Sequence, residues 1–322
     1  MSETVALGAE STSSDVMRGV DLSGKFAVVT GGSGGLGYET ARAVLAAGAD
    51  VFIGARTPEK LKDATRELAK AYPERLVRSF PLDLAELESV DKFADQVLAL
   101  DRPIDLLIAN AGIMACPLER NSQGVEMQLA TNYVGHAALV SRLASAVRKA
   151  NRPRVITLTS SGHHFSDVRL GDLNFETGAY DKWIAYGQSK TASSLLALKV
   201  YKSMSRYGVT ALAVHPGFIQ TDLMRHLSRE DYLAMRERTD IELPTTPRTY
   251  KTVEQGAATT LYAATAPELE GRFAYLEDCS IALPAEKRDT LLGVMPWVTD
   301  EASAEELWRR VEGLSGRTMP LE

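Results

Sequence analysis

The sequence has few of the features that mark disulfide-stabilised, zinc-binding or membrane-spanning proteins. Its 322 residues include only two cysteines, Cys116 and Cys279, which lie far apart and have no partner at a metal-ligand spacing. We therefore predict no metal site and no disulfide framework, and we expect a reducing, cytoplasmic location. No apolar run reaches the roughly 18 residues of a membrane helix, because Arg42 and Asp50 interrupt residues 40–55.

An excess of positive charge is also missing. The chain has 36 Lys and Arg against 42 Asp and Glu, a formal net charge of −6, and no basic stripe that would neutralise phosphates. Nucleic acid is therefore not an expected partner. The polar residues 1–20 lack the basic and apolar regions of a secretory signal, so we expect a flexible arm followed by one domain over residues 21–322.

Short β-branched runs alternate with longer stretches of helical periodicity from about residue 24 onward. This pattern predicts an α/β fold, a single Rossmann-type doubly wound parallel sheet of about seven strands with helices on both faces. The predicted strands are 26–30, 51–55, 76–81, 104–109, 154–159, 209–215 and 273–276. The predicted helices are 35–48, 58–71, 86–100, 123–150, 183–206 and 252–266, with a C-terminal amphipathic helix at 301–314.

Two regions break this alternation, residues 161–182 and 216–250. Both follow the carboxyl ends of predicted strands, where doubly wound sheets bind ligands. We therefore expect both regions to be active-site loops.

A glycine-rich turn joins the first predicted strand directly to an amphipathic helix. Glycines there allow a tight turn and a close approach of the backbone to a pyrophosphate, whose charge the helix N-terminus attracts. The residues expected to contact a dinucleotide are Gly31, Ser33, Gly34, Gly35, Leu36 and Gly37. A plain strand-to-helix loop is the alternative for this turn taken alone.

The spacing of this turn, with Thr30 and Gly31 followed by Gly35 and Gly37, resembles the short-chain dehydrogenase/reductase family. Members of that family that use NAD carry an acid at the end of the second strand. Here Ala55 takes that position and Arg56 follows, which suits a 2′-phosphate. The resemblance therefore implies NADP(H) as the preferred cofactor and leaves NAD(H) open, and the alternative for Arg56 is a solvated side chain at a helix start.

Further residues match the cofactor-binding positions of the family. Asp83 and Leu84 match its adenine-contacting pair, although Asp83 could instead cap the following helix. The resemblance also assigns cofactor contacts to Asn110, Ala111, Gly112, Pro216, Gly217, Ile219 and Thr221. One departure is Ala109, where many members have a second asparagine before Asn110.

Tyr186 and Lys190 lie four residues apart in a helical stretch, so their side chains share one face. A phenol with a pKa near ~10 is a poor acid or base at neutral pH, but a nearby ammonium favours its phenolate. Tyr186 is thus the predicted general acid/base, and both residues are also expected to contact the cofactor. The alternative is a surface tyrosine beside a solvated lysine.

The resemblance completes a catalytic tetrad with Asn132 and Ser160, and Ser161 is the less favoured alternative for the serine. Ser160 would donate a hydrogen bond to the substrate oxygen. Asn132 would disturb its helix so that a backbone carbonyl holds a water linked to Lys190, and an exposed helical asparagine is the alternative. His163 and His164 are interpreted as ordinary loop histidines without a metal role.

Local strings resemble the retinol-dehydrogenase-like and WW-domain-oxidoreductase-like branch, namely residues 112–117, 132–136 and 275–279. The resemblance implies an NADP(H)-dependent oxidoreductase that interconverts an alcohol and a ketone or aldehyde on a bulky apolar small molecule. A C=C reductase and a non-catalytic NADP(H) sensor of the same fold stay open. A homodimer or homotetramer through the helices at 123–150 and 183–206 is also implied, and the C-terminal tail could block or extend such contacts.

Overall fold

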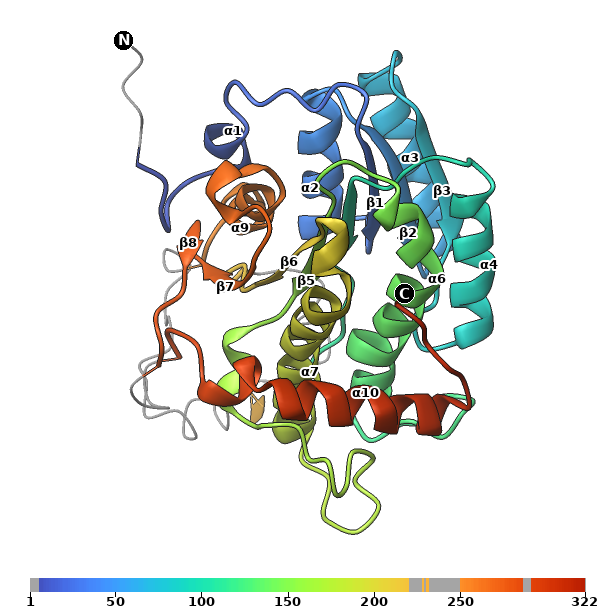
Figure 1. Ribbon diagram of the computed structural model, residues 1–322, viewed down its shortest axis with the longest axis vertical. Helices are drawn as coiled ribbons and strands as arrows, with labels where there is room; N and C mark the ends of the chain where they lie inside the picture. The colour runs from blue at the N-terminus through green and yellow to red at the C-terminus, as the bar shows by residue number, and fades with distance from the viewer. Residues whose placement is uncertain (1–5, 220–227, 229, 232–249, 286–290, 322) are drawn as a thin grey trace.

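An eight-stranded sheet forms the centre of the molecule in the computed structural model, which describes residues 6–219, 228, 230–231, 250–285 and 291–321 (Figure 1). The strand order is β3-β2-β1-β4-β5-β6-β7-β8, and all pairs are parallel except β7 with β8. This confirms the predicted doubly wound sheet. The strands are β1 (Phe26–Thr30), β2 (Asp50–Ala55), β3 (Val77–Pro81), β4 (Leu106–Ala109), β5 (Arg154–Leu158), β6 (Thr210–Val214), β7 (Phe273–Glu277) and β8 (Ser280–Ile281).

The edge strand β8 is absent from the prediction. It pairs with β7 through a tight turn in which Asp278 and Cys279 both have positive φ angles, 48° and 55°. Two exposed residues carry no alternation of apolar and polar side chains, and the turn lacks the glycine that such geometry favours. No sequence signal therefore marked this hairpin.

Helices cover both faces of the sheet, as predicted (Figure 1). One face is packed by α4 (Leu87–Leu98), α6 (Gly135–Arg148) and α7 (Lys182–Met204), and the other by α2 (Gly35–Ala46), α3 (Pro58–Ala71) and α9 (Val253–Thr265). Successive strand residues alternate between the two cores: Phe26 and Val28 face the first, Ala27 and Val29 the second. Continuous apolar strands therefore bury both of their faces.

Short helical turns lie between several of the longer elements. They are α5 (Met127–Leu129), η1 (Ala130–Val134), η2 (Ser161–His164), η3 (Ser205–Tyr207), η6 (Pro267–Leu269) and η7 (Pro296–Thr299). The predicted helix at 123–150 is thus divided into α5, a π-helical turn η1 and α6. It starts later than predicted because Glu126 caps α5, accepting hydrogen bonds from the backbone N–H groups of Gln128 and Leu129.

The C-terminal helix α10 (Glu301–Ser315) lies across α7 (Figure 1). Leu307, Trp308 and Val311 are buried in the core, as its amphipathic pattern predicts. Beyond it the Ser141 hydroxyl of α6 donates to the Pro320 carbonyl. The tail therefore covers part of the helix surface through which the resemblance implied self-association.

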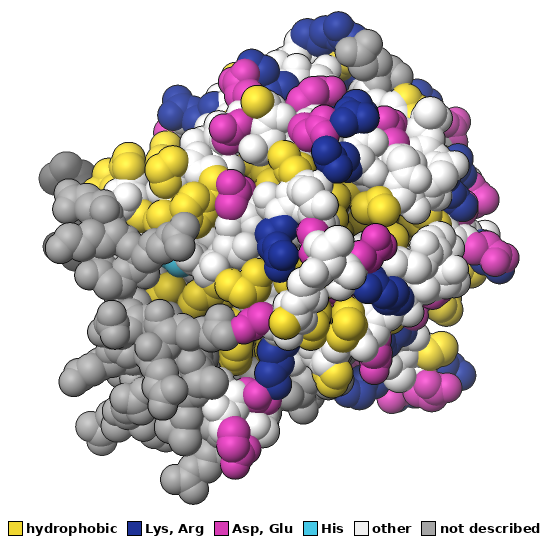
Figure 2. Space-filling model, turned by 90° about the horizontal axis from the view of Figure 1, so that it is seen from below, with side chains coloured by type: hydrophobic (Ala, Val, Ile, Leu, Met, Phe, Trp, Pro, Cys, Tyr) yellow, Lys and Arg dark blue, Asp and Glu magenta, His cyan; other side chains and the backbone are white. Residues whose placement is uncertain are grey.

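Charged side chains of both signs are mixed on the face of the molecule seen from below (Figure 2). This agrees with the small net negative charge and the lack of a basic stripe in the sequence. No helix among the described residues is long and apolar enough to cross a membrane.

The N-terminal segment differs from the expected flexible arm. Residues 13–16 form a helix, α1, that packs against α9 and α2, and Ser13 and Val16 are buried. Thr12 and Asp15 form a capping box, and the Ser13 hydroxyl donates to the Glu39 carboxylate of α2. A four-residue helix shows no periodicity, so apart from this capping box only its tertiary contacts define it.

Replacing Val16 with aspartate tests this packing. Val16→Asp places a charge at a buried contact and should lower the free energy of unfolding by about 2 kcal/mol or more, as measured by urea denaturation. Ser14→Asp, at an exposed position of the same helix, is the matched control and should change stability by less than about 0.5 kcal/mol. Equal stability of the two variants would show that α1 does not pack as described.

Candidate active site

The site begins where the strand order reverses, between β1 and β4. The Asn110 side-chain amide donates to the Thr30 carbonyl at 2.8 Å, and the Ala111 N–H donates to the Thr30 hydroxyl at 3.0 Å. A Cβ on Gly31, whose φ is +71°, would lie 2.8 Å from the Asn110 amide, and one on Gly37 would lie 2.3 Å from the Gly31 carbonyl. Only glycine fits these two positions, so the turn closes tightly beside the crevice.

The helix that follows this turn presents an uncapped N-terminus. α2 starts at Gly35, and its N-cap residue, Gly34, has no side chain to bond the first N–H groups. Those N–H groups and the helix dipole favour an anion at this point. The glycine turn therefore has the properties of a phosphate site.

A cavity of about 660 Å³ runs from this turn to the N-terminal part of α7. Every described residue predicted to contact the cofactor lines it: Gly31, Ser33, Gly34, Gly35, Leu36, Gly37, Arg56, Asp83, Leu84, Asn110, Ala111, Gly112, Tyr186, Lys190, Pro216, Gly217 and Ile219. Ser160 lines it as well. Thr221 and most of the predicted loop 216–250 lie outside the described residues.

Two cations border the end of the cavity near β2. Arg56 follows that strand and is exposed, and Lys60 lies in the first turn of α3. We did not predict Lys60, because Arg56 precedes the N-cap of α3 and no helical spacing relates the two side chains. Asp83 does not cap a helix, because α4 has Glu86 at its N-cap; its carboxylate instead accepts the Ala85 N–H at 3.0 Å.

Tyr186 and Lys190 share the inner face of α7, and both are buried. The Lys190 Nζ lies 5.8 Å from the centre of the Tyr186 ring and donates to the Leu158 carbonyl of β5 at 3.0 Å. The Thr159 hydroxyl donates to the Lys190 carbonyl at 2.8 Å. The alternative of an exposed tyrosine beside a solvated lysine is therefore wrong.

Burial shifts the pKa values of this pair in opposite directions. It raises the pKa of Tyr186 to about 12, against a smaller lowering by a hydrogen bond with Ser160, and it lowers the pKa of Lys190 to about 8. Both changes favour the uncharged forms. The expected lowering of the Tyr186 pKa by Lys190 is therefore not found: burial raises this pKa, and the lowering influence comes from Ser160.

Ser160 follows β5 and faces Tyr186. Its hydroxyl oxygen accepts the Gly162 N–H at 3.0 Å and takes part in the hydrogen bond with Tyr186. Ser161 is buried in η2 and does not line the cavity. The geometry thus brings Ser160, rather than Ser161, to the tyrosine.

Asn132 lies buried in the π-helical turn η1, so the exposed alternative is wrong. Its side chain accepts the Ile113 N–H at 2.8 Å and donates to the Ile113 carbonyl at 2.9 Å and the Ser189 hydroxyl at 2.8 Å. Its backbone carbonyl lies 3.0 Å from His136 Nδ1 and accepts the Ser193 hydroxyl at 3.2 Å. The backbone carbonyl of Asn132 itself therefore already has two protein partners.

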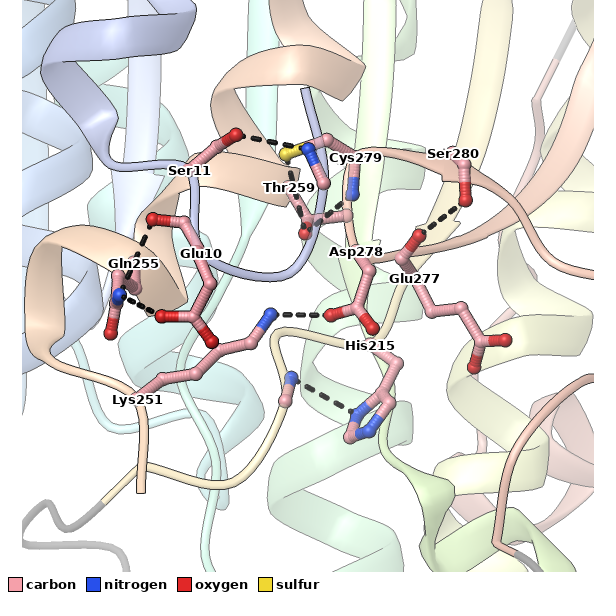
Figure 3. A network of polar contacts seen from close by, with 12 residues as sticks. Glu10, Ser11, His215, Lys251, Gln255, Thr259, Glu277, Asp278, Cys279 and Ser280 are labelled. Atoms are coloured by element: carbon pink, nitrogen blue, oxygen red, sulfur yellow. Dashed lines mark hydrogen bonds and ion pairs between the residues drawn. The ribbon is translucent and has the colours of Figure 1, made fainter. Parts of the chain in front are cut away.

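Behind the predicted Pro216–Gly217 motif lie a histidine and an ion pair (Figure 3). His215 Nδ1 accepts N–H groups from Ser161 at 3.3 Å and Gly217 at 3.5 Å. Lys251 pairs with Asp278 at 2.5 Å, and its side chain packs where a Cβ on Gly217 would lie. These contacts join the motif to the end of β5 and to the β7–β8 turn.

His163 and His164 are buried, which differs from their interpretation as ordinary loop histidines. Their turn, η2, is covered by residues 293–297, more than a hundred positions later in the chain. In the parts of the chain that the structure describes, no three potential ligands are grouped to hold a metal ion.

A family model described as short chain dehydrogenase matches residues 25–232. The chain belongs to the short-chain dehydrogenase/reductase family. It is 41% identical over 292 residues to a "Probable oxidoreductase" of Streptomyces lividans, covering 90% of this chain and 97% of that one. It is 33% identical over 311 residues to the WW domain-containing oxidoreductase of Gallus gallus, covering 93% and 73%, which is consistent with the suggested branch.

A solved structure of a protein from Mycobacterium Paratuberculosis has the same fold. That uncharacterized protein superposes with a TM-score of 0.72 at 30% identity and covers 97% of this chain and 99% of its own. The family and the fold agree, and this short-chain dehydrogenase/reductase is accordingly an oxidoreductase.

The buried lysine should reduce the stability of the protein. Because the pKa of Lys190 is lowered from 10.5 to about 8, its charged form is disfavoured in the folded state at neutral pH. Lys190→Met should therefore raise the free energy of unfolding at pH 7 by roughly 1–2 kcal/mol, the relief of burial being partly offset by the lost bond to Leu158.

The sign of the pH dependence is fixed by the direction of that shift. The stability gain of Lys190→Met should be largest below pH 8 and shrink toward pH 10.5, as the lysine of the wild type loses its proton in both states. Lys202→Met, at a half-exposed position of the same helix, is the control and should bring no gain. A Lys190→Met protein less stable than the wild type at pH 7 would contradict the assigned burial cost.

Proposed function

We propose that this protein is an NADP(H)-dependent reductase and dehydrogenase that interconverts a ketone or aldehyde and the corresponding alcohol. The observation that supports this most directly is one cavity that joins an uncapped helix N-terminus at one end to Tyr186, Lys190 and Ser160 at the other. A dinucleotide needs a phosphate site, room for two nucleotides and a reacting group at its nicotinamide end. The residues present fit that requirement.

The proposed chemistry divides between cofactor and protein. When bound, NADPH supplies a hydride to the carbonyl carbon of the substrate. Ser160 donates a hydrogen bond to the carbonyl oxygen, and the Tyr186 hydroxyl gives that oxygen its proton. The charge of Lys190 stabilises the phenolate that remains, and Asn132 holds the strand-end loop at Ile113 in place through its two hydrogen bonds. The steps reverse for alcohol oxidation.

The cofactor preference is supported by charge. Arg56 and Lys60 border the cavity beside β2. An acid at the end of that strand would repel a 2′-phosphate, but the strand ends in Ala55. A guanidinium and an ammonium provide charge-assisted donors to phosphate oxygens. We therefore assign the 2′-phosphate of NADP(H) to these two side chains.

The remaining details stay predictions. A bulky apolar substrate is suggested by the branch resemblance, and the loop 216–250 that would shape its pocket lies largely outside the described residues. The cytoplasmic location and the homodimer or homotetramer are likewise predictions, and α10 with the tail leaves less of α6 and α7 for self-association.

Removing one oxygen atom tests the proposed proton donor. Tyr186→Phe should lower kcat for NADPH-dependent carbonyl reduction by at least a hundredfold, because the substrate oxygen loses its proton source. The Kd for NADPH, measured by fluorescence titration, should change less than about threefold. Wild-type kcat in this variant would refute the role of Tyr186.

Reversing charge beside β2 tests the cofactor assignment. Arg56→Asp should shift the ratio of kcat/KM values toward NADH by roughly 10- to 100-fold, since it replaces a donor to the 2′-phosphate with a repelling acid. Lys60→Ala should give a smaller shift in the same direction. Lys62→Asp, exposed on the same helix and away from the cavity, is the control. An equal shift of the kcat/KM ratio in this variant would show that the effect comes from net charge alone.

A further inference from the structure

We propose that His163 is a positioning residue for Ser160, which it holds in place by fixing the Ser160 carbonyl and tying it to residues 293–297. The inference rests on the proposed function, because it concerns the serine of that site. It assigns a role to a buried histidine that does not line the cavity.

The hydrogen bonds of His163 determine which ring nitrogen carries its proton. The backbone N–H of Met295 donates to His163 Nε2 at 3.2 Å. Because a backbone N–H can only donate, Nε2 is the acceptor and the proton lies on Nδ1. Nδ1 lies 2.8 Å from the Ser160 carbonyl and therefore donates to it.

The neighbouring groups keep this imidazole neutral and fixed. His163 is 0% exposed, and the Tyr275 hydroxyl lies 3.1 Å from its Nδ1. Burial, together with neighbouring His164, lowers the pKa of His163 to about 3. The backbone carbonyl of His163 also accepts the indole N–H of Trp297 at 3.1 Å, so both ring and backbone contact the C-terminal segment.

The peptide group after Ser160 is held at both of its polar atoms. The Ser160 carbonyl accepts the His163 Nδ1–H at 2.8 Å and the His163 backbone N–H at 3.0 Å. The N–H of the same peptide group, which belongs to Ser161, donates to His215 Nδ1 at 3.3 Å. The two neutral imidazoles thus add to this backbone bond in restraining rotation of the peptide plane. Rotation would shift the chain between Ser160 and Gly162, whose N–H donates to the Ser160 hydroxyl, and so disturb the hydroxyl that contacts Tyr186.

Displacing a catalytic group has a large effect on rate. A shift of about 1 Å in a reacting group costs on the order of 100-fold in turnover. Loss of the Nδ1 contact should therefore lower kcat. Cofactor binding, which depends on the glycine turn and the end of β2, should be unaffected. A merely structural role would lower stability and leave kcat of the folded protein unchanged.

Three substitutions separate the two ring nitrogens. His163→Asn keeps an amide N–H near the position of Nδ1, His163→Gln places its amide near Nε2, and His163→Phe keeps only the ring shape. We expect kcat for carbonyl reduction to fall by roughly 10- to 100-fold in His163→Gln and His163→Phe and to return to within about fivefold of the wild type in His163→Asn. The KM and Kd for NADPH should change less than about twofold in all three.

The control is His164→Phe, the same substitution at the adjacent buried position. His164 Nε2 lies 3.2 Å from the Gly293 carbonyl and its ring lies 4.4 Å from that of His163, so it contacts the same C-terminal segment without supplying the Nδ1 bond to the Ser160 carbonyl. We expect it to lose stability as His163→Phe does, by thermal denaturation, and to keep kcat within about threefold of the wild type. An equal loss of kcat in His164→Phe, or a His163→Asn protein as slow as His163→Gln, would overturn the proposal.

The two proposals fail in different ways. A wild-type protein that reduces no carbonyl compound, or a Tyr186→Phe protein that reduces one as fast, contradicts the proposed function. Wild-type kcat in folded His163→Gln, with Tyr186→Phe inactive, contradicts only the role of His163. If His163→Phe does not fold, the comparison of His163→Asn with His163→Gln decides the question.

Discussion

Two hydrogen bonds between helix α7 and the end of strand β5 position the residues of the proposed active site. The Lys190 ammonium donates to the Leu158 carbonyl, and the Thr159 hydroxyl donates to the Lys190 carbonyl. They fix the rotation of α7 about its axis, and this sets Tyr186, one helical turn earlier, against Ser160. The helix therefore buries a lysine at a cost in stability, and the proposed function would account for that cost.

Burial also determines the charge state of the residues around the site. It keeps Tyr186 a phenol at neutral pH, the form that gives a proton to a carbonyl oxygen. It also lowers the pKa values of the buried histidines, to about 4 for His136 and His215 and about 3 for His163. Neutral imidazoles keep fixed donor and acceptor nitrogens, so the supporting hydrogen bonds do not change across the neutral range.

The features that were predictable from the sequence are those specified by local patterns. Strand positions followed from continuous apolar runs, and Tyr186 with Lys190 followed from a spacing of four residues. Features created by contacts between distant segments were not predictable. α1 is defined by α9, and the burial of His163 is due to Met295 and Trp297.

Two further features of the site were not predicted, for similar physical reasons. The sequence suggests a lowered Tyr186 pKa because it shows a lysine nearby, but it does not show the desolvation that acts on both groups. Lys60 was overlooked because it reaches the cavity only once α3 is folded against β2.

The central claim is that the protein moves a hydride and a proton to a C=O bond, and product analysis tests it most directly. Purified protein would be incubated with NADPH and a panel of bulky apolar aldehydes, ketones and conjugated enones, and cofactor and products would be quantified together. The account predicts one alcohol formed for each NADPH oxidised. Saturated ketones from the enones, or tight NADPH binding without oxidation by any compound, would contradict it.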